Sequence, residues 1–272
     1  MSPGFGWISF TTDYGTADGF VAACKGVIAT IAPAAAVVDV THQVPPGDVR
    51  RGSAVLAQTA PWLPPAVHLA VVDPGVGTGR RAVAVVAPRG VLVGPDNGLL
   101  LPAADALGGV THAYELTERE FRLPQVSSTF HGRDVFAPAA AHLARGVDPA
   151  RFGPPVAAGD LVRLPAPTVH IGQNSLRSEV LSVDSFGTVQ LAATARDLDA
   201  AGLHESTEAT VHSGDSRREA RIGRTFADVR SGALVVIVDS AGHVAVAVNG
   251  GSAAAELRTG PGGELTVRHS RP

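Results

Sequence analysis

Charged side chains that could do chemistry flank a glycine-rich turn in the first third of the chain. An apolar run at 67–72 predicts a buried strand that ends on Asp73. The chain then turns through three glycines and reaches Arg80 and Arg81. Functional groups of α/β proteins gather beyond the carboxyl ends of the strands. A carboxylate and a guanidinium held there could serve chemistry. The alternative is a turn with a surface ion pair.

Two further candidates stand at the ends of predicted elements. Asp13 follows the first strand and, like Asp73, has no periodic reason to be acidic. His131 stands at or just before the start of a helix that Gly146 ends. The positive end of a helix dipole disfavours imidazolium, and a neutral histidine can accept a proton or a hydrogen bond from water. A capping or packing histidine is the alternative.

These candidates need rigid elements to position them. Up to about Phe152, the hydrophobic periodicity predicts such elements. The pattern predicts strands at 7–11, 36–41 and 67–72, helices at 20–31, 48–60 and 99–107, and a hairpin of strands at 82–87 and 91–93. Asp18 is placed to cap the first helix. Strands that alternate with helices indicate an α/β domain.

The pattern changes after Phe152. Proline-rich stretches precede short strands and turns, with hairpins predicted at 179–191 and 233–248. Short strands with regular turns are typical of a small barrel or sandwich. We therefore expect two domains, residues 1–165 as an α/β domain with a central sheet flanked by helices and residues 166–272 as a smaller β domain.

Composition narrows the class of protein. The 272 residues are 45% hydrophobic and 17% charged, which is typical of a globular chain with a sizeable core. The net charge of -3 and the lack of a Lys/Arg cluster argue against a nucleic-acid partner. The one cysteine excludes an internal disulfide and a multi-cysteine metal site. Because neither a signal peptide nor a membrane-spanning run is evident, we expect no membrane partner and a cytoplasmic location.

The motifs together resemble one family, the S-adenosyl-L-methionine (SAM) hydroxide adenosyltransferases, which are homologous to fluorinases and chlorinases. Each motif is weak alone, but their order and spacing along nearly the whole chain are specific. The resemblance is carried by 12–15, 39–42, 73–78, 94–98, 129–134 and the two C-terminal turns at 184–187 and 239–242.

The resemblance implies an α/β domain followed by a β-barrel, and a homotrimer with its substrate between subunits. The implied reaction is attack of water on C5′ of SAM, giving adenosine and L-methionine without a cofactor or metal. It places the water-activating triad on Asp73, Arg80 and His131. The implied substrate contacts are Asp13 with the ribose hydroxyls, Asp18, Gly19, Phe20, Phe130 and Gly132 around the nucleoside, Asp184 with the methionine ammonium, and Phe186, Thr188, Phe226, Ser240, Asn249 and Gly250 with the adenine or methionine.

These residue types suit that chemistry. A sulfonium leaves as a neutral thioether and needs no acid, so the task is to align a weak nucleophile, which can supply roughly 7–11 kcal/mol in the best intramolecular cases. Arg80 would stabilise hydroxide-like charge, and Asp73 would orient Arg80 or the water. His131 can accept a hydrogen bond. Which of the three is the formal base stays open.

Three positions depart from the family pattern. Thr188 stands where relatives commonly have Asn, Ala241 stands where the halogenases have arginine, and Arg81 beside Arg80 leaves open which guanidinium points inward.

Two other functions compete with hydrolysis. A halogenase would need a small dry pocket, where this chain has Val76, Gly132 and a polar triad. A non-catalytic SAM or adenosine binder would not need the triad. A metal hydrolase would need closely spaced His or Asp ligands, and this chain has no such motif.

Overall fold

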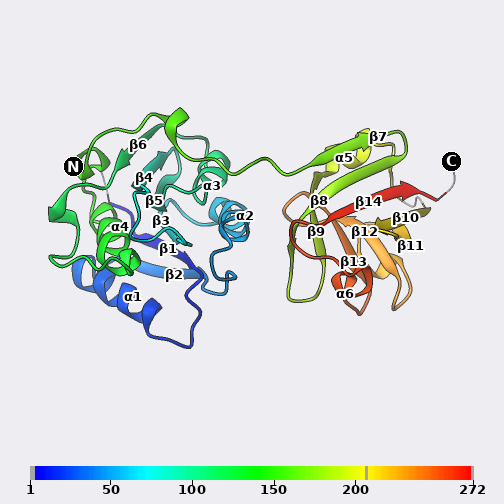
Figure 1. Ribbon diagram of the computed structural model, residues 1–272, viewed down its shortest axis with the longest axis horizontal. Coiled ribbons are helices and arrows are strands. Elements are labelled where there is room, and N and C mark those ends of the chain that lie inside the picture. Colours follow the sequence, from blue (N-terminus) through cyan, green and yellow to red (C-terminus); the bar gives the residue numbers. More distant parts are fainter. Residues whose placement is uncertain (1–3, 206–207, 271–272) are drawn as a thin grey trace. The chain divides into compact units, whose positions relative to one another are not determined.

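The computed structural model describes residues 4–205 and 208–270. The chain divides into two compact units, residues 1–164 and 165–272 (Figure 1). Each unit is built around its own sheet and its own apolar core.

The first unit is organised by a six-stranded sheet in the order β2-β1-β3-β5-β4-β6. The strands are β1 (Trp7–Thr12), β2 (Ala36–Thr41), β3 (Ala66–Val71), β4 (Ala82–Ala87), β5 (Gly90–Pro95) and β6 (His112–Glu115). Strands β1, β2, β3 and β5 run parallel, while β4 is antiparallel to both of its neighbours. The carboxyl ends of β1, β2 and β3 therefore lie along one edge of the sheet.

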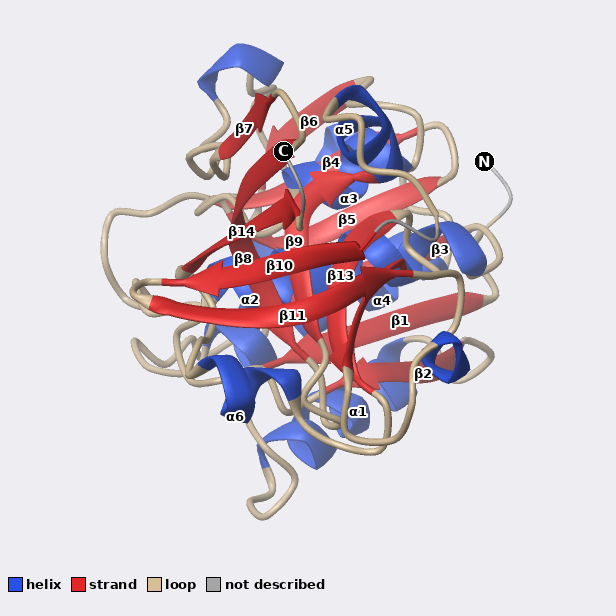
Figure 2. Cartoon of the chain, turned by 90° about the vertical axis from the view of Figure 1, so that its right-hand side faces the viewer, coloured by secondary structure: helices blue, strands red, loops and turns tan. Residues whose placement is uncertain are grey.

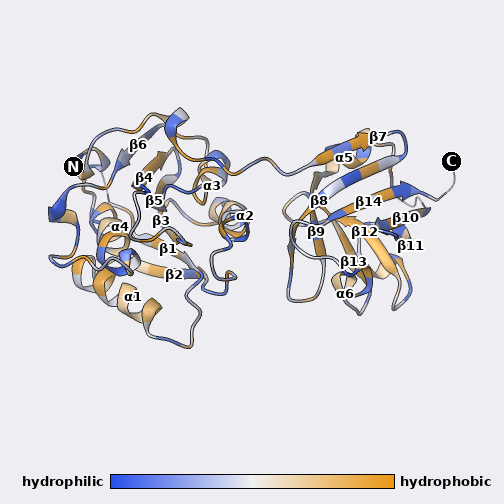
Figure 3. Ribbon diagram, in the orientation of Figure 1, coloured by the Kyte–Doolittle hydropathy of each residue, from blue (hydrophilic) through white to orange (hydrophobic). Residues whose placement is uncertain are grey.

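Helices cover both faces of this sheet. α1 (Phe20–Ile31) and α4 (Ala137–Ala144) share a core with Val67, Leu69 and Val71 of β3. α2 (Val49–Thr59) and α3 (Leu101–Ala106) share the opposite core with Ala70 of β3 and with Val72, the first residue after the strand. Since side chains alternate between the faces of a strand, a strand buried on both sides is expected to be mainly apolar, and every residue of β3 except His68 is apolar (Figure 3).

The predicted elements of this unit are confirmed with small shifts of their ends. Asp48 caps α2 by accepting from the amide of Arg51 at 2.9 Å. The helix after His131 differs in kind, because its first turn, Gly132–Phe136, is π-helical and only then continues as α4. Single π turns inside helices occur often at functional sites. Strand β6 is short and half-exposed, and the hydrophobic pattern of its sequence does not predict it.

The second unit is a closed β-barrel. Its strands are β7 (Val169–Gly172), β8 (Ser175–Val183), β9 (Val189–Thr194), β10 (Glu208–Ser213), β11 (Ser216–Ile222), β12 (Leu234–Val238), β13 (His243–Val248) and β14 (Glu264–His269), with short helices α5 (Ala195–Ala200) and α6 (Ala253–Leu257). β14 pairs with both β10 and β8 and closes the ring, while β7 adds to β8 from outside (Figure 2). Closure decides between the barrel and the sandwich, and both predicted hairpins are present.

No helix among the described residues has the length and apolar character needed to cross a lipid bilayer.

Candidate active site

The Asp73–Arg80 loop follows β3 at the sheet edge where β1 and β2 also end. Tight turns shape this loop, with the amide of Val76 donating to the carbonyl of Asp73 at 3.2 Å and the Thr78 hydroxyl donating to the Gly75 carbonyl at 2.7 Å. Gly77 has a φ of +77°, and a Cβ there would lie 2.3 Å from the Ser128 carbonyl oxygen. Glycine is therefore required where the loop passes close to the segment before His131.

Asp73 and Arg80 form a nearly buried ion pair. Arg80 Nε lies 3.0 and 3.1 Å from the two carboxylate oxygens, and Arg80 Nη2 also donates to Oδ2. The side chains are 5% and 11% exposed, and the guanidinium lies over the ring of Phe136 at 5.1 Å. Bidentate geometry and burial rule out the surface ion pair that the loop sequence alone also allowed.

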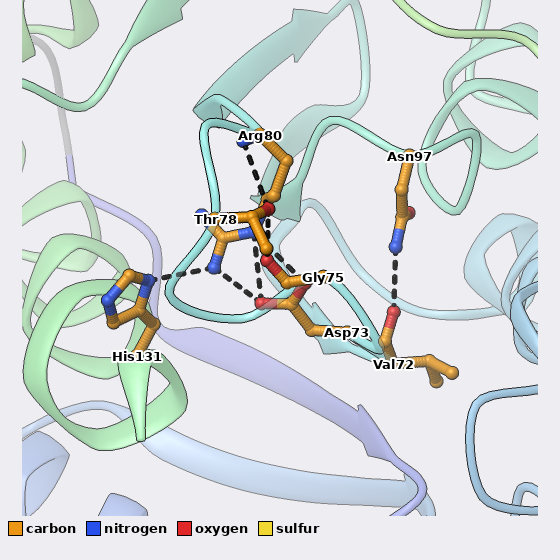
Figure 4. Close-up of polar contacts among 7 residues, drawn as sticks. All are labelled: Val72, Asp73, Gly75, Thr78, Arg80, Asn97 and His131. Carbon is orange, nitrogen blue, oxygen red and sulfur yellow. Dashed lines mark hydrogen bonds and ion pairs between the residues drawn. The ribbon is translucent and has the colours of Figure 1, made fainter. Parts of the chain in front are cut away.

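His131 completes the arrangement from the helix that follows it. Its Nδ1 lies 2.8 Å from Arg80 Nη2, at the start of the π turn (Figure 4). Burial and then the Arg80 charge lower the pKa of His131 below its ordinary value. A guanidinium has donors and no acceptor, so Nδ1 must be the acceptor in this contact. The imidazole is then neutral with its proton on Nε2.

Arg81 turns away from this group. Its Nε donates to Asp96 at 2.9 Å, and its guanidinium also reaches the carbonyl of Asp160. The open choice between the two arginines is thus settled by geometry, because Arg80 is the one that meets Asp73 and His131.

A pocket opens beside the triad. Residues from the ends of β1 and β3, from the loop after β2 and from the start of the π turn line it, namely Asp13, Tyr14, Gly47, Val71, Asp73, Pro74, Val76, Thr129, His131 and Gly132. Asp13 Oδ2 accepts from the Gly47 amide at 2.8 Å, which fixes the carboxylate at the pocket wall. The structure therefore brings Asp13 and Gly132 together with Asp73 and His131.

Tyr14 is a pocket residue to which the motifs assign no role. A Cβ at residue 132 would lie 2.0 Å from the Tyr14 hydroxyl, so this tyrosine packs directly on Gly132. Burial and nearby acidic groups raise the pKa of Tyr14, which keeps its hydroxyl protonated as a donor. Its ring also contacts Phe20 and Phe130, with centroids 6.0 and 5.8 Å apart. Its position directly after Asp13 is the sequence signal from which a place in the pocket could be predicted for Tyr14.

The segment before α1 differs from its prediction. The N-cap of α1 is Gly19, and no side chain caps the helix, so the capping role predicted for Asp18 is wrong. The physical reason is that the helix begins one residue later than Asp18 requires. Asp18 and Gly19 are exposed and are not among the residues that line the pocket, while Phe20 approaches it through the aromatic contacts with Tyr14 and Phe130.

Most of the predicted residues of the second unit gather at one end of the barrel. Asp184 Oδ1 accepts from the amides of Phe186 and Thr188 at 2.9 and 2.8 Å, which orders the turn between β8 and β9. Asn249 Nδ2 donates to the Val229 carbonyl at 2.8 Å, close to Phe226 in sequence. The pairing of Val189 with Val246 brings this turn beside the end of β13, where Asn249 and Gly250 follow. Phe186 and Phe226 are 81% and 50% exposed.

Ser240 lies apart from this group. It occupies the turn between β12 and β13 with Ala241, where Asp239 accepts from the amides of Ala241 and His243. The six residues of β13 separate this turn from Asn249, which corresponds to roughly 20 Å of strand. The structure therefore does not bring Ser240 together with Asn249 and Gly250.

Comparisons with known proteins identify the family of this chain. The SAM hydroxide adenosyltransferase N-terminal domain matches residues 8–153, and the C-terminal domain of the same family matches residues 178–266. This chain belongs to the SAM hydroxide adenosyltransferase family. The family that the sequence motifs resemble is thereby confirmed.

Within this family the similarity extends over whole chains. The chain is 60% identical to the (R)-S-adenosyl-L-methionine hydrolase of Salinispora arenicola, over 96% of this chain and 97% of the relative. It is 28% identical to a fluorinase of Actinopolyspora mzabensis, over 97% of each chain. A crystal structure of an uncharacterized conserved protein from Thermotoga maritima superposes with a TM-score of 0.91 at 35% identity, covering 96% of this chain and all of that one.

Proposed function

We propose that this member of the SAM hydroxide adenosyltransferase family hydrolyses SAM to adenosine and L-methionine. The observation that carries the proposal is the nearly buried Asp73–Arg80 pair with His131 Nδ1 against the same guanidinium, at the wall of a pocket that also holds Asp13. The hydrolase name of a relative at 60% identity supports the same reaction. Fluorinases are more distant at 28%.

In the proposed reaction a water oxygen bonds to C5′ while the C5′–S bond breaks. The sulfur keeps the bonding electrons and leaves as the neutral thioether of methionine, and the water loses a proton. Arg80 stabilises the negative character that develops on the attacking oxygen. Asp13 holds the ribose hydroxyls, since its Gly47 contact fixes the carboxylate at the wall beside them. Positioning of this kind lowers the barrier without a cofactor.

The hydrogen bonds favour Asp73 as the group that takes the proton. His131 Nδ1 faces Arg80, so its remaining nitrogen carries a hydrogen and donates to the water. Asp73 accepts from Arg80 with both oxygens, but an ionised carboxylate offers about four acceptor sites. We therefore assign His131 to orientation of the water and Asp73 to proton acceptance.

The remaining contacts follow the family pattern. We place the methionine ammonium at Asp184 and the adenine beside Phe186, Thr188, Phe226, Asn249 and Gly250, with Phe20 and Phe130 near the nucleoside. Asp18 and Gly19 do not line the pocket, and Ser240 lies in another turn. The (R) epimer at sulfur is the proposed substrate, as in the name of the relative.

We further propose a cytoplasmic homotrimer in which the first domain of one subunit and the second domain of a neighbour share each substrate. We place the domain boundary at residue 165, beside the division between the two compact units. Exposed Phe186 and Phe226 support a barrel end that is covered in such an assembly.

The deciding experiment uses 18O-labelled water. Purified protein is incubated with (R)-SAM, and the products are analysed by mass spectrometry with and without added chloride, bromide or fluoride. Label in the 5′-hydroxyl of adenosine establishes attack at C5′. Unlabelled adenosine contradicts the mechanism, a halo-nucleoside indicates a halogenase, and binding without any product over hours indicates a sensor. Sedimentation of the same sample tests the trimer.

A further inference from the structure

The turn at residues 94–98 follows β5, and its sequence predicts only ordinary turn chemistry. Two of its side chains instead contact the residues that flank the Asp73–Arg80 loop, one at each end. The same turn also contacts the segment that leads out of the first unit.

One contact holds the start of the loop. Asn97 Nδ2 donates to the carbonyl of Val72, the residue immediately before Asp73, at 2.9 Å (Figure 4). The other side of the same amide accepts from the Leu99 amide at 3.2 Å. Because both ends of the Asn97 side chain are bonded, its orientation is fixed, and so is the position of the backbone from which Asp73 projects.

A second set of contacts holds the end of the loop. The Asp96 amide donates to the carbonyl of Arg81 at 3.0 Å, and Asp96 Oδ2 accepts from Arg81 Nε at 2.9 Å. The Asp96 side chain is only 4% exposed. Charge-assisted hydrogen bonds of this kind are about twice as strong as neutral ones. They fix the residue immediately after Arg80.

Asp96 also contacts the segment that leads into the second unit. Its Oδ1 accepts from the Val162 amide at 2.8 Å, and Arg81 donates to the Asp160 carbonyl. The backbone of this segment is therefore bonded to the same carboxylate that holds Arg81. In contrast, the neighbouring ion pair of Arg163 with Asp105 is exposed on both sides and does not involve Asp96.

We propose that Asp96 and Asn97 are positioning residues that hold both ends of the Asp73–Arg80 loop, and that Asp96 also ties this loop to the segment entering the second unit. Neither residue touches the pocket. They act by keeping Asp73 and Arg80 at hydrogen-bonding distance from each other and Arg80 Nη2 at His131. The inference rests on the proposed function, because the loop matters only if the triad acts on substrate.

Two isosteric variants test the two ends. Asn97→Asp keeps the acceptor for Leu99 and removes the donor to Val72. Asp96→Asn keeps an acceptor for Val162 and removes the acceptor for Arg81. Since misplacement by about 1 Å can cost about 100-fold in rate, we expect kcat for SAM to fall by about 10- to 100-fold while KM changes by less than about threefold. Arg163→Ala is the matched control, and it should keep both parameters.

A second readout does not need substrate. Nitrogen NMR of the His131 imidazole should show the proton on Nε2 in the parent chain and mixed tautomers in both variants, since Arg80 is no longer held at Nδ1. If parent chain and variants give the same His131 signals and the same kcat per folded molecule, the proposal is wrong. Where Asn97→Asp does not fold, Asn97→Ala removes the same donor without adding charge. Absence of adenosine from the parent chain would count against the proposed function, and the NMR comparison would then decide the positioning role alone.

Discussion

Arg80 Nη2 lies 2.8 Å from His131 Nδ1, and this contact determines which nitrogen of the imidazole carries the proton. Because arginine only donates, a protonated His131 cannot keep the contact. Acidification should therefore separate the two side chains and disturb the Asp73–Arg80 pair as well. The contact connects the protonation state of one residue to the geometry of all three.

Replacement of the triad residues should slow turnover far more than it weakens binding. Asp73→Asn keeps the shape of the side chain but removes its charge, and we expect kcat to fall by about 100- to 10,000-fold because a positioned acid or base is worth about that much. Arg80→Ala and His131→Ala should also lower kcat. Single-turnover rates and the Kd for SAM measure the two effects separately. Near-parental turnover in any variant would remove that residue from the mechanism.

The pH profile should show the neutral form of His131 as the active one. Since burial and Arg80 lower its pKa, the imidazole loses its proton at a lower pH than an exposed histidine. The charged groups that influence it are Arg80, Asp73, Arg122 and Asp134. We expect kcat/KM to stay level from neutral pH through about 6.5, the ordinary histidine value, and to fall only below it. A rate that rises on acidification would contradict the assignment.

Gly132 should not tolerate a side chain while Tyr14 is present. A Cβ there would lie 2.0 Å from the Tyr14 oxygen and 3.0 Å from its Cζ, so Gly132→Ala should cost about 1–3 kcal/mol of unfolding free energy, as overpacking does. Tyr14→Phe removes the nearest atom and should recover part of that loss. Urea unfolding of both single variants and the double variant gives the coupling energy. Simple additivity would show that the two residues do not press on each other.

The buried His68 should make the first unit sensitive to acid. This residue is 0% exposed, its Nδ1 is 2.8 Å from the Ser9 hydroxyl, and burial lowers its pKa to about 4. The unfolded chain takes up the proton first, near pH 6.5, so the stabilising effect is present above that pH. It is lost progressively as the pH falls towards 4, by up to about 3 kcal/mol.

Chemical unfolding between pH 7 and 4 measures this effect. His68→Gln should flatten the dependence of unfolding free energy on pH, because glutamine does not titrate. His204→Gln is the control, since His204 has a side chain that is 67% exposed. Equal slopes for the parent chain and His68→Gln would show that other groups cause the acid sensitivity.

Local elements of this fold could be predicted from the sequence, whereas pairings between distant segments could not. Strand β3 and helix α2 follow from apolar periodicity and from Asp48 as a cap, because such signals are local. The closing strand β14 pairs with β8, roughly ninety residues earlier, and no local pattern predicts that pairing. For the same reason the strand pattern allowed either a barrel or a sandwich, and only the family resemblance favoured the barrel.

The candidate site likewise has features that the sequence predicts and features that it does not. Asp13, Asp73 and His131 could be singled out because each stands at the end of an element. The divergence of Arg80 and Arg81, the packing of Tyr14 on Gly132 and the separation of Ser240 from Asn249 could not. These contacts and distances involve segments that are far apart in the sequence, so local residue types do not predict them.

Arg80 and Arg81 are neighbours directly before β4, and their side chains contact different carboxylates. One meets Asp73 and the other meets Asp96. We expect deletion or insertion of one residue in the Asp73–Arg80 loop to displace Arg80 from Asp73 or Arg81 from Asp96. Substitution is a different matter at Gly79, where a Cβ would meet no atom within 4 Å. The length of this loop is therefore constrained more tightly than the residue type at Gly79, and homologous loops should keep their length while this one position varies.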